Sequence, residues 1–330
     1  RRPRGEGGLM GSATPLLTRG SPYPARLRAY LAERFPLLGN VLLIASYYSS
    51  NQFLAQALLH PGEPMRYGPW SLPGAVALLC FFFHLRVFDE HKDFEEDSRN
   101  YPERVLQRGL VTLKDLRRLG AAAIALEVIL GALRGWGALS SVLAAQLFSL
   151  LMLKEFFAGG WLRRRFLLYA TSHMLIMPLL GIVVFGFAAG LPAWEAPAWF
   201  WLYALVGFFV TFNWEVSRKI RAPEEEREGV DSYTKVFGTL GAANVVLAIR
   251  VIDTALVSLV GWRLGASGWF YLVLVALFGV CLVGYFQYRL RPSPRTAKRM
   301  EVYAAAYIVA FDLTLAVELA ARHGIAWGGE

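Results

Sequence analysis

Nine apolar runs, each close to the length of a membrane span, constrain this chain more than any other feature. About 20 consecutive apolar residues suffice for a helix to cross the hydrocarbon core of a bilayer, and lipid offers no partner to an unpaired backbone group. Hydrophobic residues make up 55% of the 330 residues, a larger share than soluble domains usually carry. We therefore predict an all-α integral membrane protein with nine transmembrane helices bundled around a central cavity. The runs are residues 37–59, 71–88, 118–135, 136–153, 167–190, 196–214, 238–260, 269–288 and 302–321.

The charge pattern divides the chain into three parts. Residues 1–34 are rich in Arg, Gly and Pro, and we expect a flexible basic segment there. Residues 35–322 hold the apolar runs and form the transmembrane domain. Residues 323–330 are a short C-terminal tail.

Basic residues are distributed unevenly between the two sides of such a bundle. With the N-terminus inside, all but five of the 34 Lys and Arg residues lie on the inner side, and this bias sets membrane orientation. We therefore expect the N-terminus and the long charged loops, which cap the bundle, on the cytoplasmic side of a bacterial or archaeal cell membrane. Anionic lipids are the expected partners of this charge, and nucleic acid is not. The five exceptions are Arg66, Arg134, Arg250, Arg263 and Arg322.

Three aspartates recur at every fourth residue after the second apolar run. On a continuous helix Asp89, Asp93 and Asp97 share one face, and like charges at this spacing repel each other. A cation has to neutralise them, and carboxylate oxygens are hard ligands that suit Mg²⁺. A solvated acidic face at the membrane edge is the alternative, but the regular spacing favours a site. We predict that all three aspartates bind Mg²⁺ and are catalytic.

Basic residues near the inner ends of the helices are suited to phosphate oxygens, which guanidinium groups can bind in a bidentate manner. Together with Mg²⁺ they predict a site that holds a diphosphate. Some of them are equally suited to anchor the chain at lipid headgroups, and both interpretations stay open. The candidate diphosphate ligands are Arg86, Lys92, Arg104, Arg108, Lys154, Arg218, Lys219 and Arg221.

A second charged segment follows the sixth apolar run. Glu215 lies at the end of that run, where an unpaired carboxylate is costly and therefore a candidate for function. We predict a second metal site with Glu215 and Glu225 as ligands, and a catalytic role for Glu215. A salt-bridged surface loop is the alternative, since acidic and basic residues alternate over residues 215–228.

Ionisable residues inside the apolar runs raise another possible function. Arg250 and Asp253 share a helix face, so we expect them to neutralise each other. Asp312 has no obvious partner, and His173 either satisfies a packing hydrogen bond or takes part in catalysis. A transporter would place polar groups at mid-membrane depth, whereas here the charge gathers at the inner ends. Transport therefore remains a less favoured alternative.

The first charged segment resembles the first motif of the UbiA superfamily of intramembrane prenyltransferases. That motif is Asn-x3-Asp-x3-Asp, and Asp89, Asp93 and Asp97 occupy its positions with Asp in place of Asn. Arg104-Val-Leu is similar to the Arg-Pro-Leu of the family, and Lys154 matches a lysine that ends the fourth span. The resemblance covers about residues 35–322.

The second charged segment departs from the family pattern. The family carries Asp-x3-Asp before the seventh helix, and alignment from Gly229 places Arg221 and Glu225 in those positions. Only one carboxylate is retained there, and Glu215 is a candidate replacement for the other. The segment from Gly229 to Gly238 is similar to the one that leads into the seventh helix of the family.

The resemblance implies an enzyme that ionises a prenyl diphosphate with Mg²⁺ as its cofactor. It implies transfer of the prenyl group to an aromatic or lipid acceptor, so the partners are a prenyl diphosphate, a hydrophobic acceptor and membrane lipids. The superfamily also includes terpene cyclases, which use no separate acceptor. The altered second motif keeps that alternative open.

Overall fold

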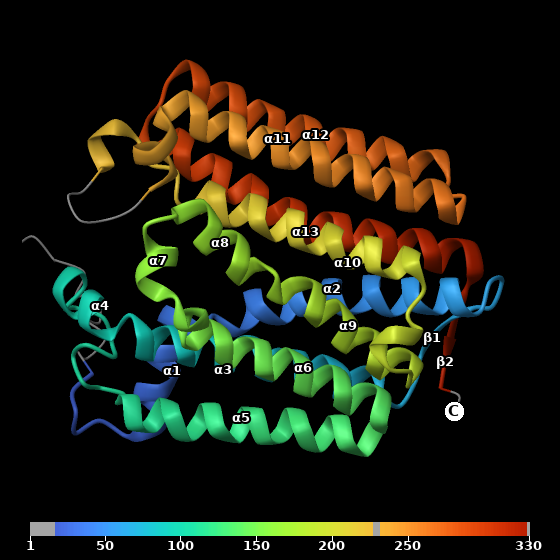
Figure 1. Ribbon diagram of the computed structural model, residues 1–330, viewed down its shortest axis with the longest axis horizontal. Helices are drawn as coiled ribbons and strands as arrows, with labels where there is room; N and C mark the ends of the chain where they lie inside the picture. Colours follow the sequence, from blue (N-terminus) through green and yellow to red (C-terminus); the bar gives the residue numbers. More distant parts are fainter. Residues whose placement is uncertain (1–16, 227–231, 329–330) are drawn as a thin grey trace, which may run out of the picture.

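The computed structural model describes residues 17–226 and 232–328, in which helices predominate and two three-residue strands pair with each other (Figure 1). This confirms the prediction of an all-helical protein. The elements are α1 (Tyr23–Arg34), α2 (Leu37–Leu59), β1 (Met65–Tyr67), α3 (Ser71–Lys92), α4 (Phe94–Asn100), α5 (Leu113–Arg134), α6 (Trp136–Leu153), η1 (Glu155–Phe157), α7 (Gly159–Arg163), α8 (Phe166–Met174), α9 (Ile176–Ala189), η2 (Ala193–Glu195), α10 (Ala198–Arg218), η3 (Pro223–Glu225), α11 (Tyr233–Leu264), α12 (Gly268–Leu290), α13 (Pro294–His323) and β2 (Ile325–Trp327).

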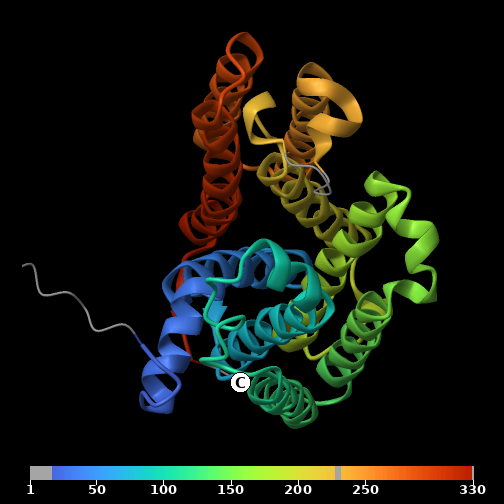
Figure 2. The same cartoon turned by 90° about the vertical axis from the view of Figure 1, so that its left-hand side faces the viewer.

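The long helices lie side by side and form two connected groups. In the first group α3 packs against α5 and α9, and α6 packs against α5 and α9. In the second group α11 packs against α10 and α12, and α13 packs against α10 and α12. Contacts of α2 with α13 and of α9 with α10 join the two groups, and the end-on view in Figure 2 shows the orange and red helices beside the blue-to-green ones.

Six helical segments of the described chain are long and apolar enough to cross a membrane, which supports an integral membrane protein. Only 22% of the apolar window of α12 is buried, so most of its apolar side chains face outward, as they do against lipid. The predicted count of nine spans is not confirmed, because α2, α5 and α10 do not meet the same criterion. Each of the three carries polar residues, such as Asn51 in α2, Lys114 in α5 and Glu215 in α10. The six segments are α3, α6, α8 with α9, α11, α12 and α13.

Helix breaks fall inside two of the predicted runs. The run 167–190 is divided into α8 and α9 at Leu175, because Pro178 lacks an N–H and its ring clashes with the carbonyl four residues earlier. Helix α11 bends at Gly238, whose φ of 68° is accessible to glycine at little cost. The runs 118–135 and 136–153 separate at Gly135, where φ is 121°.

Polar side chains inside the bundle pair with each other. Arg250 donates to Asp253 at 2.9 Å, which confirms the predicted neutralisation. Asp312, which has no partner evident from sequence, accepts hydrogen bonds from Ser50 at 2.6 Å and from Tyr203 at 3.0 Å. These bonds reduce the cost of burying polar groups between helices.

The charged segments gather at one end of the bundle, at the left in Figure 1, where α1, α4, α7 and η3 lie. We call it the charged end. Residues 23–34, which we expected within a flexible segment, form α1, and Tyr30 of this helix is fully buried. At the opposite end the C-terminal tail forms β2, which pairs in parallel with β1.

The buried ion pair in α11 predicts a specific stability change. Arg250→Met should destabilise the protein by about 3–5 kcal/mol, because it leaves the fully buried Asp253 without a cation. The double variant Arg250→Met/Asp253→Leu should recover most of this loss. Thermal unfolding in detergent measures both, and a double variant no more stable than the single one would contradict the ion-pair explanation.

Candidate functional site

Helix α3 carries the aspartate motif to the charged end and ends at Lys92. Asp93 joins α3 to the short helix α4 with a φ of −98° and a ψ of 4°. The backbone N–H of Asp93 bonds to the carbonyl of Asp89, and that of Asp97 to the carbonyl of Asp93, each at 2.8 Å. The three residues therefore follow each other at intervals of one turn, as their spacing predicts, although the helix is interrupted in the middle.

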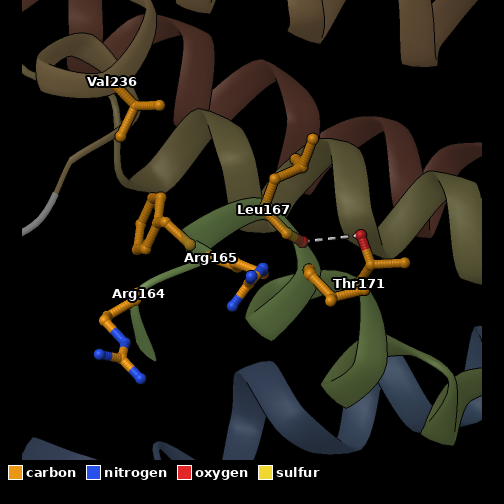
Figure 3. Close-up of a pocket in the computed structure, with 7 residues that line it drawn as sticks. Arg164, Arg165, Leu167, Thr171 and Val236 are labelled. Atoms are coloured by element: carbon orange, nitrogen blue, oxygen red, sulfur yellow. Dashed lines mark hydrogen bonds between the residues drawn. The ribbon is translucent and has the colours of Figure 1, made fainter. Parts of the chain in front are cut away.

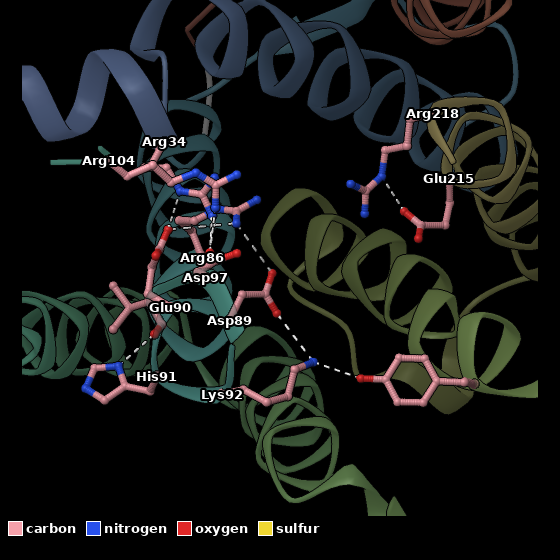
Figure 4. Close-up of polar contacts among 12 residues, drawn as sticks. Arg34, Arg86, Asp89, Glu90, His91, Lys92, Asp97, Arg104, Glu215 and Arg218 are labelled. Carbon is pink, nitrogen blue, oxygen red and sulfur yellow. Dashed lines mark hydrogen bonds and ion pairs between the residues drawn. The ribbon is translucent and has the colours of Figure 1, made fainter. Parts of the chain in front are cut away.

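Asp97 is neutralised by the protein itself. Its Oδ2 accepts a hydrogen bond from Arg104 at 2.6 Å and lies 3.5 Å from Arg34. Arg34 also binds the buried Glu90 at 2.6 Å, so α1 is fixed to the end of α3 and to α4 (Figure 4). Asp97 and Arg104, which we predicted to bind metal and diphosphate, are thus engaged with each other.

Asp89 and Asp93 are much less strongly paired. Among the described residues, Asp89 has only long ion pairs, at 3.8 Å to Lys92 and 3.9 Å to Arg86, and its side chain is 47% exposed. Within the described chain, no hydrogen bond or ion pair within 4 Å joins the Asp93 carboxylate to another residue. These two carboxylates are therefore available to a cation.

The pKa of Asp93 reflects this shortage of neutralising charge. The pKa of this carboxyl is raised to about 6, mainly by burial; Lys92 lowers it, and the negative charges of Asp89 and Asp97 raise it. The carboxylate form is thus less favourable than that of an ordinary aspartate, although it still predominates at pH 7. A divalent cation beside it would stabilise that form.

Asp89 and Asp93 fit the way proteins hold Mg²⁺ beside phosphates. Such sites use one or two carboxylates, and water and substrate phosphates complete the coordination. Over residues 17–226 and 232–328, no three His, Cys, Asp or Glu side chains converge as a metal cage. The pair therefore suits a metal whose remaining ligands come from the substrate.

The end of α10 presents a second charged group. Glu215 is 4% exposed and accepts from Arg218 Nε at 2.6 Å and from Lys219 Nζ at 2.7 Å. Figure 4 shows the Glu215–Arg218 pair across from Asp89 and Lys92. Glu215 is thus an anchor for two cations, and the geometry does not favour the metal ligation that we predicted for it.

Glu225 lies apart from Glu215. Its Oε2 accepts a hydrogen bond from the backbone N–H of Ala222 at 3.1 Å and so closes the start of η3. In the described part of the chain, no contact brings the two glutamates together. Residues 227–231, where the segment similar to the seventh-helix entry of the family begins, lie outside the described residues.

Three predicted diphosphate ligands have other surroundings. Arg108 donates to the carbonyl of Leu17 at 2.9 Å. Arg221 follows α10 and donates to the carbonyl of Arg218 at 2.9 Å, so it binds the end of that helix. Lys154 is exposed where α6 ends.

Tyr169 is a site residue that sequence reasoning missed. Its hydroxyl accepts from Lys92 Nζ at 3.0 Å and so connects α8 to the Lys92–Asp89 ion pair. The two residues are 77 positions apart, and no local sequence pattern predicts their contact. Arg34 was missed for the same reason, because its partner Glu90 is 56 positions away.

A recess of about 450 Å³ lies between the start of α8 and the start of α11 (Figure 3). Among the described residues no carboxylate lines it, so this lining does not suit a metal. At 100° per residue, Leu167 and Thr171 lie on the face of α8 opposite Tyr169. The lining residues are Arg164, Arg165, Phe166, Leu167, Leu168, Thr171 and Val236.

Comparison with known proteins shows which family this arrangement resembles. Residues 51–308 match the model of the UbiA prenyltransferase family. No curated protein matches the chain.

Solved structures share the fold at low sequence identity. A digeranylgeranylglyceryl phosphate synthase structure is 16% identical with a TM-score of 0.60, over 89% of this chain and 99% of that one. A UbiA homologue from Aeropyrum pernix K1 is 17% identical with a TM-score of 0.56, over 85% and 97%. A UbiA homologue from Archaeoglobus fulgidus bound to GPP and Mg²⁺ is 13% identical with a TM-score of 0.55, over 87% and 99%.

The pKa of Asp93 predicts pH-dependent metal binding. With a pKa of about 6, the carboxylate that binds metal is present at pH 7 and mostly protonated at pH 5. Mn²⁺, used as a paramagnetic substitute in a titration, should bind about tenfold more weakly at pH 5 than at pH 7. Asp93→Asn should remove most of this difference, and equal affinity of the unaltered protein at both pH values would contradict the assignment.

Proposed function

This chain belongs to the UbiA prenyltransferase family, and we propose that it ionises a prenyl diphosphate with Mg²⁺ and transfers the prenyl group to an aromatic or lipid acceptor. One observation carries the proposal: Asp89 and Asp93 are adjacent carboxylates with weak protein partners, at the charged end of a helical bundle. Carboxylates so placed bind a metal, and a metal at the end of an apolar bundle can hold the polar head of an amphiphilic substrate.

The side chains around this pair have distinct roles in the proposed reaction. Asp89 and Asp93 would hold Mg²⁺, which when bound neutralises charge on the diphosphate. Lys92 and Arg86 lie beside Asp89, and Arg218, which is anchored by Glu215, lies across from it. These groups attract the phosphate oxygens and stabilise the charge that builds on the leaving diphosphate.

The apolar helices provide the remainder of the site. The prenyl chain would lie between them, away from the charged end. An allylic cation formed there is shielded from water, and aromatic rings stabilise positive charge. The basic residues at the charged end support a cytoplasmic position for it in a bacterial or archaeal cell membrane.

Two structural neighbours support the substrate class. The Archaeoglobus fulgidus protein was solved with GPP and Mg²⁺, which supports a prenyl diphosphate and this metal. The digeranylgeranylglyceryl phosphate synthase supports transfer to a lipid acceptor.

The altered second motif favours terpene cyclisation as a second candidate. Arg221 and Glu225 each bind backbone groups of their own segment, so the second acidic pair of the family has no counterpart there. The purified protein with Mg²⁺ and geranyl, farnesyl or geranylgeranyl diphosphate distinguishes the two. A cyclic product without acceptor indicates a cyclase, whereas turnover only after an aromatic or lipid acceptor is added indicates a transferase.

The metal-binding role predicts the effect of removing one carboxylate. Asp93→Ala should lower turnover of the prenyl diphosphate by at least about a hundredfold, because the metal loses a ligand, while thermal stability stays close to that of the unaltered protein. Glu95→Ala, which removes an exposed charge from α4, is the matched control and should retain activity. Full activity of Asp93→Ala, or turnover that survives chelation of divalent cations, would contradict the role.

Substitution of Glu215 tests the role of the charged group that it forms with Arg218 and Lys219 at the end of α10. If it anchors Arg218 and Lys219, Glu215→Gln should raise KM for the prenyl diphosphate about tenfold and leave the Mg²⁺ requirement unchanged. Glu224→Gln, at an exposed position in η3, should change neither. A raised Mg²⁺ requirement in Glu215→Gln would restore the metal ligation that the sequence predicted.

A further inference from the structure

We propose that His173 accepts the proton that the prenylated or cyclised carbocation loses when it becomes product. This inference rests on the proposed function, because it needs a carbocation formed near Asp89. It assigns a catalytic role to a side chain that the diphosphate site itself does not use.

The hydrogen bonds of His173 define its tautomer. Nδ1 lies 2.8 Å from the backbone carbonyl of Tyr169, and because a carbonyl only accepts, Nδ1 carries the hydrogen. Nε2 therefore holds a lone pair. The side chain is 8% exposed, and Nε2 is buried with no hydrogen-bond partner in the described chain. A buried basic nitrogen without a donor is equipped to take a proton.

The position of His173 matches that of the reacting carbons. Its ring stacks on Tyr169 with 4.2 Å between centroids, and the Tyr169 hydroxyl contacts Lys92, which pairs with Asp89. His173 lies four residues further along α8, so its backbone lies about 6 Å deeper in the bundle than that of Tyr169. A diphosphate held near Asp89 would leave its first carbons at this depth.

A strained segment completes the surroundings of His173. Glu155, Phe156 and Phe157 have φ angles of 48°, 54° and 56°, a left-handed conformation that non-glycine residues rarely adopt. The segment brings the ring of Phe156 edge-on to His173, with 5.6 Å between centroids. Backbone strain of this kind persists mainly at functional sites, and the face of the Tyr169 ring, which stacks on His173, would stabilise the charge of an imidazolium.

His91 shows that an unpartnered Nε2 is not sufficient by itself. Its Nδ1 bonds to the carbonyl of Val87 at 2.8 Å, and its Nε2 also has no partner in the described residues. Figure 4 shows His91 turned away from Asp89 and Lys92. The two histidines thus share their local bonding and differ in whether they lie near the site.

Proton transfer to His173 is the last step of the proposed reaction. Ionisation breaks the bond between C1 and oxygen, and the diphosphate leaves with the electron pair. An acceptor carbon, or a double bond of the prenyl chain, attacks the cation and forms a carbon–carbon bond. The resulting cation loses a proton to Nε2, and the electrons of that C–H bond form a double bond. The imidazolium then returns the proton to water.

His173→Asn tests this step, because asparagine keeps a donor for the Tyr169 carbonyl and lacks the base. The assay uses the full chain in liposomes with Mg²⁺ and geranyl diphosphate, together with the acceptor if the unaltered protein requires one, and measures pyrophosphate and organic products separately. We expect pyrophosphate release within about twofold of the unaltered protein, because ionisation does not need the base. The deprotonated product should fall about a hundredfold, and alcohols should replace it. Water gives a cyclic alcohol when it captures the cyclised cation, and geraniol when the new carbon–carbon bond breaks again and the geranyl cation is captured.

Chemical rescue and a matched variant separate catalysis from packing. Added imidazole should restore product formation in His173→Ala, and this variant decides the question if His173→Asn does not fold. His91→Asn should keep the product ratio of the unaltered protein. An unchanged ratio of deprotonated product to alcohols in His173→Asn, or a loss in His173→Ala that imidazole does not reverse, would overturn the inference. Absence of Mg²⁺-dependent pyrophosphate release from the unaltered protein would instead reject the proposed function.

Discussion

Repulsion among three carboxylates at the end of one helix is the constraint on which the site depends. Asp89, Asp93 and Asp97 follow each other at intervals of one turn, so they cannot all remain ionised without cations nearby. The protein neutralises Asp97 with arginines and leaves Asp93 with a raised pKa. The unbalanced charge is thus confined to two neighbouring positions, where an external divalent cation can bind.

The bundle brings distant segments together around this charge. Arg34 on α1, Tyr169 on α8 and Glu215 on α10 all contribute to the charged end, while the interior of the bundle holds paired groups such as Arg250 and Asp253. Helix interruptions also shape the charged end. Helix α3 ends and α4 begins within the aspartate motif, and η1 brings Phe156 beside His173. The charged groups of the candidate site therefore lie where helices end or are interrupted.

Sequence patterns predicted those features that depend on residues close together in the chain. Apolar run length indicated the helical membrane bundle, the four-residue spacing indicated the aspartate motif, and the spacing of Arg250 and Asp253 indicated their pairing. Contacts across the bundle left no such pattern, so Arg34 and Tyr169 were missed. Arg218 and Lys219 are close to Glu215 in sequence, yet only the three-dimensional geometry shows that both neutralise it.

A structure of the unaltered protein with Mg²⁺ and geranyl diphosphate tests the central claim most directly. The account predicts the metal on Asp89 and Asp93, with the diphosphate between them and the Arg218–Lys219 pair and the geranyl chain directed toward His173. Diphosphate bound instead in the recess beside Arg164 and Arg165, with no metal on the two aspartates, would contradict it.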